Sequence, residues 1–270
     1  MMKGNIGFIG CGNMGSAMIS GILSSNLYGK DRIFASAHTQ STLDRLSAAY
    51  GISVTLDNTE IVKNCDIIFL AVKPFLYPSI IEEIRDVSDN TKIFVAIAAG
   101  ISHLKLHNFF GKPVKIVRAM PNTPAQVLEA MSALTPNEYV KTEELQIVKT
   151  IFESFGKAEV IPESLMDAVI GVSGSSPAYV YMFIEAMADA AVYDGMPRNM
   201  AYTFAAQAVY GAAKMVLETK QHPGELKDAV CSPAGTTITA VAKLEELGLR
   251  NAVIEAQRCC TAKSKEMERS

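Results

Sequence analysis

Residues 230–238, which read V-C-S-P-A-G-T-T-I, combine the residue types best suited to hold a small anion. Ser232, followed by proline, is a helix-start signal, and Gly235 allows a tight turn. Thr236 and Thr237 then add two hydroxyls to the free backbone N–H groups of a first helical turn. Because helix N-termini favour negative charge, the segment predicts a site for a small carboxylate. The alternative is an ordinary capped turn between two helices.

A second segment, G-C-G-N-M-G at residues 10–15, predicts a phosphate-binding loop. It follows the apolar run 6–9 and precedes a helical stretch, so it lies between a strand and a helix. Gly10 permits the tight turn, Gly12 lets the backbone approach a pyrophosphate, and Gly15 allows close helix packing. The motif alone is weak, but this context favours dinucleotide binding over a purely structural turn.

The residues after the second expected strand, 32–35, indicate which dinucleotide binds. About twenty residues beyond the last glycine, an NAD-specific site presents Asp or Glu to the ribose 2′-hydroxyl. This chain instead has S-A-H-T-Q at residues 36–40. With hydroxyls and no carboxylate there, we expect NADPH as the cofactor and NADH as a weaker one, although no arginine clamp follows. Ser36 and Thr39 could instead be caps of the helix expected over 41–50.

The composition is that of an enzyme with two domains. The chain has 270 residues, of which 49% are hydrophobic and 20% charged, enough for two cores. The net charge is −3 and the basic residues are scattered, so no nucleic-acid partner is expected. Apolar runs such as 67–72 have strand length, which predicts no membrane partner. No signal peptide is visible before the glycine loop, and we expect a cytoplasmic protein.

Cysteine and histidine patterns give no metal or disulfide framework. The 5 cysteines contain no C-x-x-C pair, so we expect reduced thiols. His103 and His107 could share a helix face, but no acidic third ligand lies nearby in the sequence. We therefore expect no bound metal.

Periodicity divides the chain into an α/β part and a helical part. Strands are expected at 5–10, 32–35, 52–54, 66–71, 92–97, 114–118, 130–135 and 158–161, alternating with amphipathic helices. This predicts an N-terminal Rossmann-type doubly wound parallel sheet in a domain over 1–163. Only helical patterns follow, including 177–194, 197–217 and 249–269, which predicts an all-α domain over 164–270.

Small or turn-forming residues follow several of the expected strands. A-V-K-P at 71–74 and A-A-G at 98–100 leave room for a ribose or nicotinamide at the carboxyl edge of the sheet. Each could equally be a simple turn or helix entry. R-A-M-P-N-T-P at 118–124 is rich in turn residues and predicts a loop, with Arg118 either a site residue or a structural ion-pair partner.

The helix expected around 178–192 is apolar on most of its circumference and rich in alanine. Such a helix must be covered on nearly all sides, which one small helical domain can hardly do. We therefore expect it to form an interface between two copies of the chain. The alternative is the central helix of a monomeric bundle.

Matching segments are spread over almost the whole chain: F-I-G-C-G-N-M-G at 8–15, A-V-K-P at 71–74, R-A-M-P-N-T-P at 118–124, S-G-S-S-P-A-Y at 173–179, H-P-G-E-L-K-D at 222–228 and S-P-A-G-T-T-I at 232–238. Together they resemble the pyrroline-5-carboxylate reductase family. The resemblance implies NADPH-dependent reduction of 1-pyrroline-5-carboxylate to L-proline, the last step of proline biosynthesis. It also implies a homodimer with interlocked helical dimerisation domains, which could assemble into a multiple such as a decamer.

The resemblance also implies site residues. Cofactor contacts fall on Gly10, Cys11, Gly12, Asn13, Met14, Gly15, Ser36, Asn58, Ala71, Val72, Lys73, Pro74, Ile97, Ala98 and Ala99, and substrate contacts on Glu163, Ser232, Gly235, Thr236 and Thr237. Thr237 is the expected catalytic residue, a hydrogen-bond partner of the ring nitrogen, and Glu163 could assist electrostatically. Two positions depart from the family: Ala229 stands where asparagine often contacts the cofactor, and Ala234 replaces a usual glycine.

Other functions fit parts of the pattern. A related NADP-dependent imine or 2-hydroxy-acid reductase would share the first domain, and Lys214 would be its candidate catalytic lysine. A non-catalytic nucleotide sensor would not need the carboxylate-binding segment 230–238. An interaction scaffold would explain the apolar helix but neither glycine-containing loop.

Overall fold

The computed structural model describes residues 4–269, which form two compact units. The first contains the described residues up to Ser175 together with Cys260 and those after it, and the second is Ser176–Cys259. Helix α12 (Leu249–Arg269) therefore contributes to both units. The boundary expected at residue 163 marks the end of the strands, whereas the division into compact units falls later and returns within α12. Within residues 4–269, no helix has both the length and the apolar character needed to cross a bilayer.

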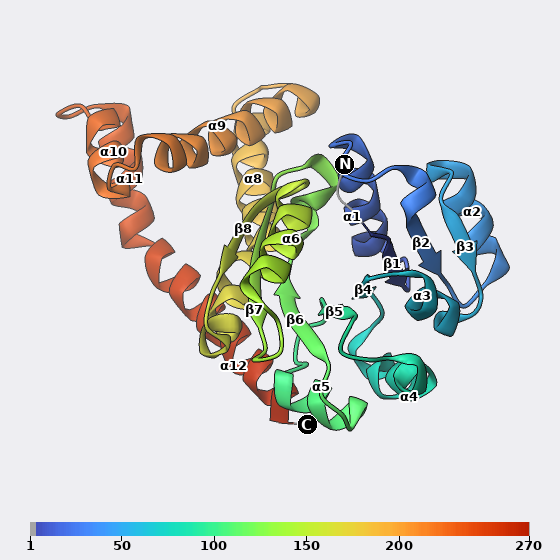
Figure 1. The fold of residues 1–270 in the computed structure, drawn as a ribbon. Helices are drawn as coiled ribbons and strands as arrows, with labels where there is room; N and C mark the ends of the chain where they lie inside the picture. The colour runs from blue at the N-terminus through green and yellow to red at the C-terminus, as the bar shows by residue number, and fades with distance from the viewer. Residues whose placement is uncertain (1–3, 270) are drawn as a thin grey trace. The chain divides into compact units, whose positions relative to one another are not determined.

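The first unit is built on an 8-stranded sheet of order β3-β2-β1-β4-β5-β6-β7-β8 (Figure 1). Its strands are β1 (Ile6–Ile9), β2 (Ile33–Ser36), β3 (Ser53–Thr55), β4 (Ile67–Leu70), β5 (Ile93–Ala96), β6 (Lys115–Met120), β7 (Ala130–Pro136) and β8 (Gly156–Val160). All of the expected strands are present. The order reverses between β1 and β4, which places the cofactor crevice of a doubly wound sheet at their carboxyl ends.

The sequence pattern predicted a parallel sheet, but one pair of strands is antiparallel. β6 and β7 pair antiparallel, and β8 then runs parallel to β7. The reason lies in the connection, residues 121–129, which holds only the short 3-10 turn Thr123–Val127. A parallel crossover needs roughly a dozen or more residues, usually with a helix, so this connection can only turn the chain back.

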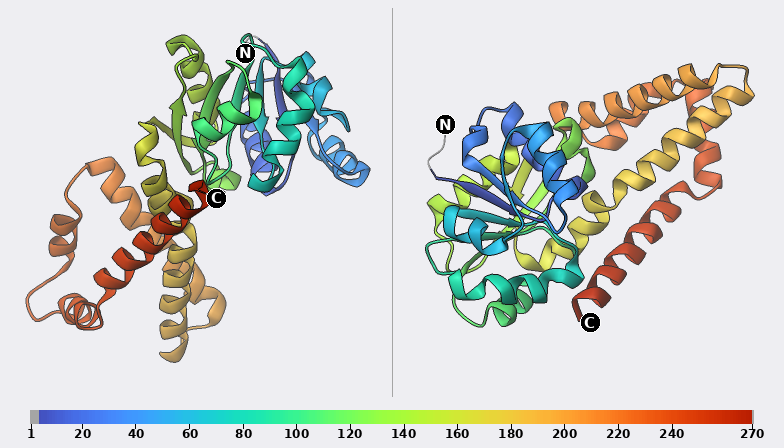
Figure 2. Two further views of the ribbon diagram at one scale, coloured as in Figure 1. Left: turned by 90° about the horizontal axis from the view of Figure 1, so that it is seen from below. Right: turned by 90° about the vertical axis from the view of Figure 1, so that its right-hand side faces the viewer.

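Helices cover both faces of this sheet (Figures 1 and 2): α1 (Asn13–Ser24), α2 (Gln40–Tyr50), α3 (Asn58–Asn64), α4 (Tyr77–Ile84), α5 (His103–Phe110), α6 (Thr142–Glu153) and the short α7 (Met166–Val169). Side chains alternate along each central strand. Phe8 and Phe69 pack with α1 and α6, whereas Ile9 and Leu70 pack with α3, α4 and α5. Two apolar layers therefore hold the strand ends in place, and with them the loops that follow.

The second unit is helical: α8 (Ser176–Tyr193), α9 (Arg198–Thr219), α10 (Pro223–Val230), α11 (Thr236–Glu246) and the first part of α12. α8 and α9 pack against each other, and their fully buried side chains are alanines: Ala188, Ala201 and Ala205. Larger apolar side chains stay exposed, including Met182 at 70% and Phe204 at 63%. α8 is therefore not the enclosed central helix of a monomeric bundle.

Candidate active site

The glycine loop between β1 and α1 adopts the conformation that a dinucleotide site requires. Gly10 has φ +83°, and a Cβ atom there would lie 2.4 Å from Val72 Cγ1, so only glycine fits against the end of β4. A Cβ at Gly12 would meet no atom within 4 Å, which leaves that stretch of backbone open to a ligand. No side chain caps α1, so its first N–H groups face outward for phosphates.

A buried tyrosine joins the two strand ends that follow. The Tyr77 hydroxyl donates to Leu70 O at 2.6 Å and accepts from the Ile97 N–H at 3.2 Å. Burial raises the pKa of Tyr77, so the phenol stays protonated. The structure thereby brings the predicted segments 71–74 and 97–99 together. The sequence pattern did not identify Tyr77, because a tyrosine in an amphipathic helix has no distinguishing motif.

The end of β2 is tied to both neighbouring segments. The Gly10 N–H donates to Ser36 O at 3.0 Å, and Ser36 Oγ donates to Asn58 Oδ1 at 2.6 Å. Asn58 Nδ2 in turn donates to Glu83 Oε2 at 2.8 Å. Ser36 is 0% exposed, so its hydroxyl is fully engaged. Thr39 is the cap of α2, where its Oγ1 accepts from the Thr42 N–H.

The other predicted cofactor contacts differ in accessibility. Asn13 and Lys73 are exposed, Met14, Ala71, Val72, Pro74, Ile97 and Ala99 are half-buried, and Cys11, Gly15 and Ala98 are buried. Burial raises the pKa of the Cys11 thiol to about 12, and the positive charge of Arg45 opposes that rise. Cys11 is therefore a neutral filler of the loop at physiological pH.

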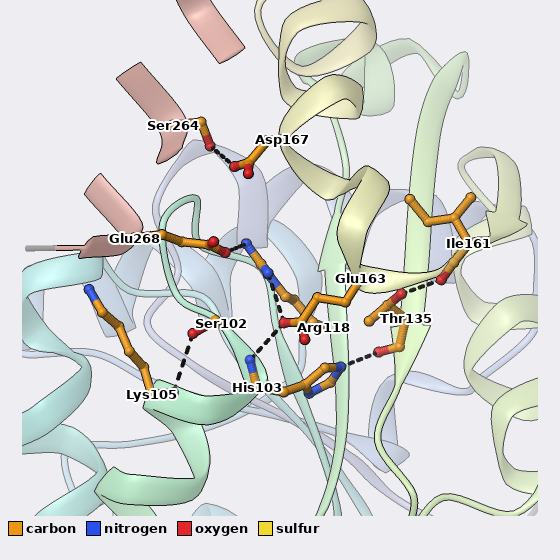
Figure 3. Close-up of polar contacts among 10 residues, drawn as sticks. All are labelled: Ser102, His103, Lys105, Arg118, Thr135, Ile161, Glu163, Asp167, Ser264 and Glu268. Atoms are coloured by element: carbon orange, nitrogen blue, oxygen red, sulfur yellow. Dashed lines mark hydrogen bonds and ion pairs between the residues drawn. The ribbon is translucent and has the colours of Figure 1, made fainter. Parts of the chain in front are cut away.

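Arg118 lies within β6, which runs on to Met120, so the first residues of the segment 118–124, expected as a loop, belong to the strand. The side chain is buried, with Nη1 2.9 Å from Glu163 Oε1 and Nη2 2.6 Å from Glu268 Oε1 (Figure 3). Of its two expected roles, the structure therefore shows the ion-pair partner. The same Glu163 Oε1 accepts the His103 N–H at 2.8 Å, so this oxygen of a predicted substrate contact belongs to a structural network.

The network continues around His103 and along the end of α12 (Figure 3). His103 Nε2 lies 3.1 Å from Thr135 O, and burial lowers the pKa of the imidazole, while nearby Glu163 partly offsets that effect. Ser264 Oγ donates to Asp167 Oδ1 at 2.6 Å. These contacts hold the last turns of α12 on the first unit.

The segment 230–238, predicted to bind a small carboxylate, lies in the second unit. α11 begins at Thr236 with Gly235 as its N-cap and no side-chain cap, which leaves the first-turn N–H groups available. A Cβ at Gly235 would lie 2.2 Å from Ser232 Oγ, so this turn requires glycine. The structure brings Ser232, Gly235, Thr236 and Thr237 into one turn, while Glu163 belongs to the other unit.

Ala234, immediately before that N-cap, has φ +57°. This left-handed conformation is unfavourable for alanine and ordinary for glycine. The departure from the family's glycine therefore strains the turn and leaves its N–H donors in place.

The strand order, the open glycine loop and the small residues at the strand ends define a dinucleotide-binding oxidoreductase of the Rossmann type. Residues 5–100 match the family model described as NADP oxidoreductase, coenzyme F420-dependent, and residues 163–267 match the model described as pyrroline-5-carboxylate reductase dimerisation. The chain is 50% identical to pyrroline-5-carboxylate reductase of Escherichia coli (strain K12) over 269 residues, covering 100% of both chains. It therefore belongs to the pyrroline-5-carboxylate reductase family.

Solved structures agree with this assignment. Pyrroline carboxylate reductase of Plasmodium falciparum, solved with NADP bound, is similar with a TM-score of 0.91 and 33% identity, covering 99% of each chain. Pyrroline-5-carboxylate reductase of Coxiella burnetii is similar with a TM-score of 0.93 and 32% identity, covering 100% of each chain. The resemblance deduced from the sequence motifs is confirmed.

Proposed function

We propose that the protein reduces 1-pyrroline-5-carboxylate to L-proline with NADPH, as the last step of proline biosynthesis. The observation that carries the proposal is the uncapped start of α11, with Thr236 and Thr237 in its first turn. A small anionic substrate needs such donors, and the Thr237 hydroxyl would be available to the ring nitrogen. The full-length similarity to reductases of that name supports the same substrate.

The first unit has the features needed to hold the cofactor. Gly12 and Asn13 at the start of α1 would bind the pyrophosphate, and the segments joined by Tyr77 would line the nicotinamide side. NADPH, when bound, supplies the hydride that the imine carbon accepts. The absence of a carboxylate at Ser36 supports NADPH over NADH. Binding a dinucleotide across these loops orients the reacting ring and excludes water from it.

The second unit would hold the substrate. The N–H groups of the α11 first turn and the Ser232 hydroxyl would bind the ring carboxylate. Thr237 would hydrogen-bond the ring nitrogen, which gains basicity as the C=N bond is reduced. Water is the proposed proton source. Glu163 would act from a distance by favouring the protonated imine, because its Oε1 is already paired with Arg118.

We further propose that the active form is a homodimer with interlocked helical domains, and that dimers could assemble into a larger multiple such as a decamer. The exposed apolar side chains of α8 and α9 and the match to a dimerisation model support this assembly. In functional terms, residues 1–163 would bind NADPH, and residues 164–270 would bind substrate and the second copy. A cytoplasmic location remains a prediction from the sequence.

The proposal is tested by mixing the protein with pyrroline-5-carboxylate and NADPH and following absorbance at the nicotinamide band. We expect NADPH oxidation matched by formation of proline, with higher catalytic efficiency for NADPH than for NADH. The alternative, a related imine or 2-hydroxy-acid reductase, would oxidise NADPH with another substrate and not with this one. Its candidate lysine, Lys214, lies on an exposed face of α9 beside Glu218, which gives that alternative no support.

A further inference from the structure

Both hydroxyls noted at the end of β2 make contacts within the chain, at the place where Rossmann-type sites distinguish NADPH from NADH by its 2′-phosphate. Ser36 is 0% exposed and already donates its hydroxyl proton to Asn58 Oδ1. Thr39 Oγ1 accepts from the backbone of α2 as its cap. A phosphate dianion is held most strongly by cations and N–H donors, so a cation near this strand end would add to what the hydroxyls can supply.

Arg45, on α2, is a cation placed beside this end of the cofactor crevice. Its Nη2 donates to Cys11 O, within the glycine loop, at 3.4 Å. The residue after Gly10 therefore touches the guanidinium, while Gly10 itself is hydrogen-bonded to Ser36 O. Arg45 thus lies close to the strand end at which Rossmann-type sites read the ribose 2′-position.

The guanidinium has spare binding capacity. A guanidinium carries five N–H donors, and within residues 4–269 the Cys11 carbonyl is the hydrogen-bond acceptor found for Arg45, with no carboxylate in ion-pair contact. The neighbouring Asp44 accepts instead from Gln40 Nε2 at 2.8 Å. Glu83, the carboxylate nearest to Ser36 through hydrogen bonds, is engaged by Asn58. Arg45 is therefore free to bind an anion.

α2 is fixed against α1 so that Arg45 stays at the loop. The Tyr50 hydroxyl, one turn beyond Arg45, donates to Ser16 O at 3.2 Å. Asn13, Ser16, Arg45 and Tyr50 line a polar cavity of about 230 Å³ between the two helices. Ser16 Oγ is buried in this part of the chain without a hydrogen-bond partner among the described residues. The cavity gives the guanidinium room to turn toward a phosphate.

We propose that Arg45 is the residue that selects NADPH over NADH, by binding the 2′-phosphate of the adenosine ribose. This inference rests on the proposed function, because it concerns the cofactor of that reaction. The competing view is that Arg45 only packs α2 against the glycine loop. In that case its loss would weaken the binding of both dinucleotides alike.

The test is calorimetric titration of the full-length protein with NADP+, NAD+, adenosine 2′,5′-bisphosphate and adenosine 5′-monophosphate. For Arg45→Gln we expect binding of the two 2′-phosphorylated ligands to weaken by about tenfold or more, the effect of losing one charge-assisted contact. Binding of NAD+ and the 5′-monophosphate should change less than about twofold. Arg45→Lys should retain part of the selectivity, because it keeps the charge but not the fork geometry.

Arg85→Gln is the matched control, because Arg85 is exposed and pairs with Asp86 away from the loop. It should leave all four affinities unchanged. Equal weakening of all four ligands by Arg45→Gln, or no weakening at all, would overturn the assignment. If the unaltered protein bound neither dinucleotide, the proposed function would fall first. If it binds NADP+ and Arg45→Gln binds it equally well, only the role of Arg45 falls.

Discussion

The two units of this chain solve the burial of apolar surface in opposite ways. In the first unit, large side chains such as Phe8, Ile19 and Phe152 are 0% exposed between the sheet and its helices. In the second, α8 and α9 bury alanines and leave Met182 and Phe204 at 70% and 63% exposure. A monomer rarely leaves so many large apolar side chains exposed within one unit.

The difference shows which part of the site a single chain can complete. The cofactor loops are fixed by contacts inside the first unit, such as those of Tyr77 and Ser36. The substrate turn at Thr236 lies in the second unit, the one with large exposed apolar side chains. We therefore expect cofactor binding to be insensitive to assembly and turnover to depend on it.

The largest effect is expected from Met182→Asp. In one chain the side chain is 70% exposed, so a charge there would cost little unless a second copy covers it. We expect loss of the dimer by light scattering and nearly complete loss of turnover, with NADP+ still bound. Leu104→Asp, at 69% exposure on α5, is the control and should stay dimeric and active. A fully active Met182→Asp monomer would refute the interface.

Next in size is Thr237→Val, which removes one hydroxyl from the substrate turn and keeps its shape. We expect kcat to fall about ten- to a thousandfold, the range for removing one positioned hydrogen-bonding group, with NADPH affinity unchanged. Thr239→Val is the control, because Thr239 is not a predicted substrate contact and its Oγ1 donates within the chain, to Gly235 O at 3.0 Å. Steady-state kinetics decide the matter. If Thr237→Val had normal turnover, the hydrogen bond to the ring nitrogen would be refuted, and the segment would serve only to bind the carboxylate.

Arg118→Met tests the packing of the first unit. It leaves Glu163 and Glu268 without their shared cation, and we expect about 2–3 kcal/mol of destabilisation in urea unfolding. The loss stays below that of a fully buried pair because these carboxylates are 37% and 25% exposed and retain some water. Arg198→Met, which breaks the exposed pair with Asp189, should lower the free energy of unfolding by clearly less than Arg118→Met. Equal costs would contradict a buried role for Arg118.

The smallest effect is expected from Ala234→Gly. Relief of the left-handed φ of +57° opposes the greater freedom of glycine in the unfolded chain, so we expect a gain of up to about 1 kcal/mol in the free energy of unfolding. Ala240→Gly, within α11, should instead lose about 0.5–1 kcal/mol. Thermal melting of both variants gives the comparison. A loss of the same size in Ala234→Gly would show that the turn is not strained.

Most of the fold could be predicted because periodicity reflects burial directly. The central strands, such as Ile67–Leu70, are continuous apolar runs of strand length, and α12 has a clear helical pattern. The antiparallel β7 was missed because strand direction depends on the length and path of a connection. The end of β6 was predicted too early, because Ala119 and Met120 come directly before the turn-forming Pro121 and Asn122 and were assigned to the loop with them.

The candidate site was predictable where it is local in sequence. The glycine loop and the α11 turn each consist of consecutive residues whose types suit one backbone geometry. Residues that act across the fold gave no such signal. Tyr77 and Arg45 sit in ordinary amphipathic helices, and only the folded chain brings them to the strand ends.

The chain leaves the first unit and returns to it at neighbouring points. It leaves after Ser175 and returns at Cys260, and Cys260 Sγ donates to Ser175 Oγ at 3.1 Å. The whole helical unit is therefore an insertion whose two ends meet. Excising residues 176–259 and closing the gap with a short glycine linker should yield a small protein that still folds and binds NADP+, checked by circular dichroism and calorimetry.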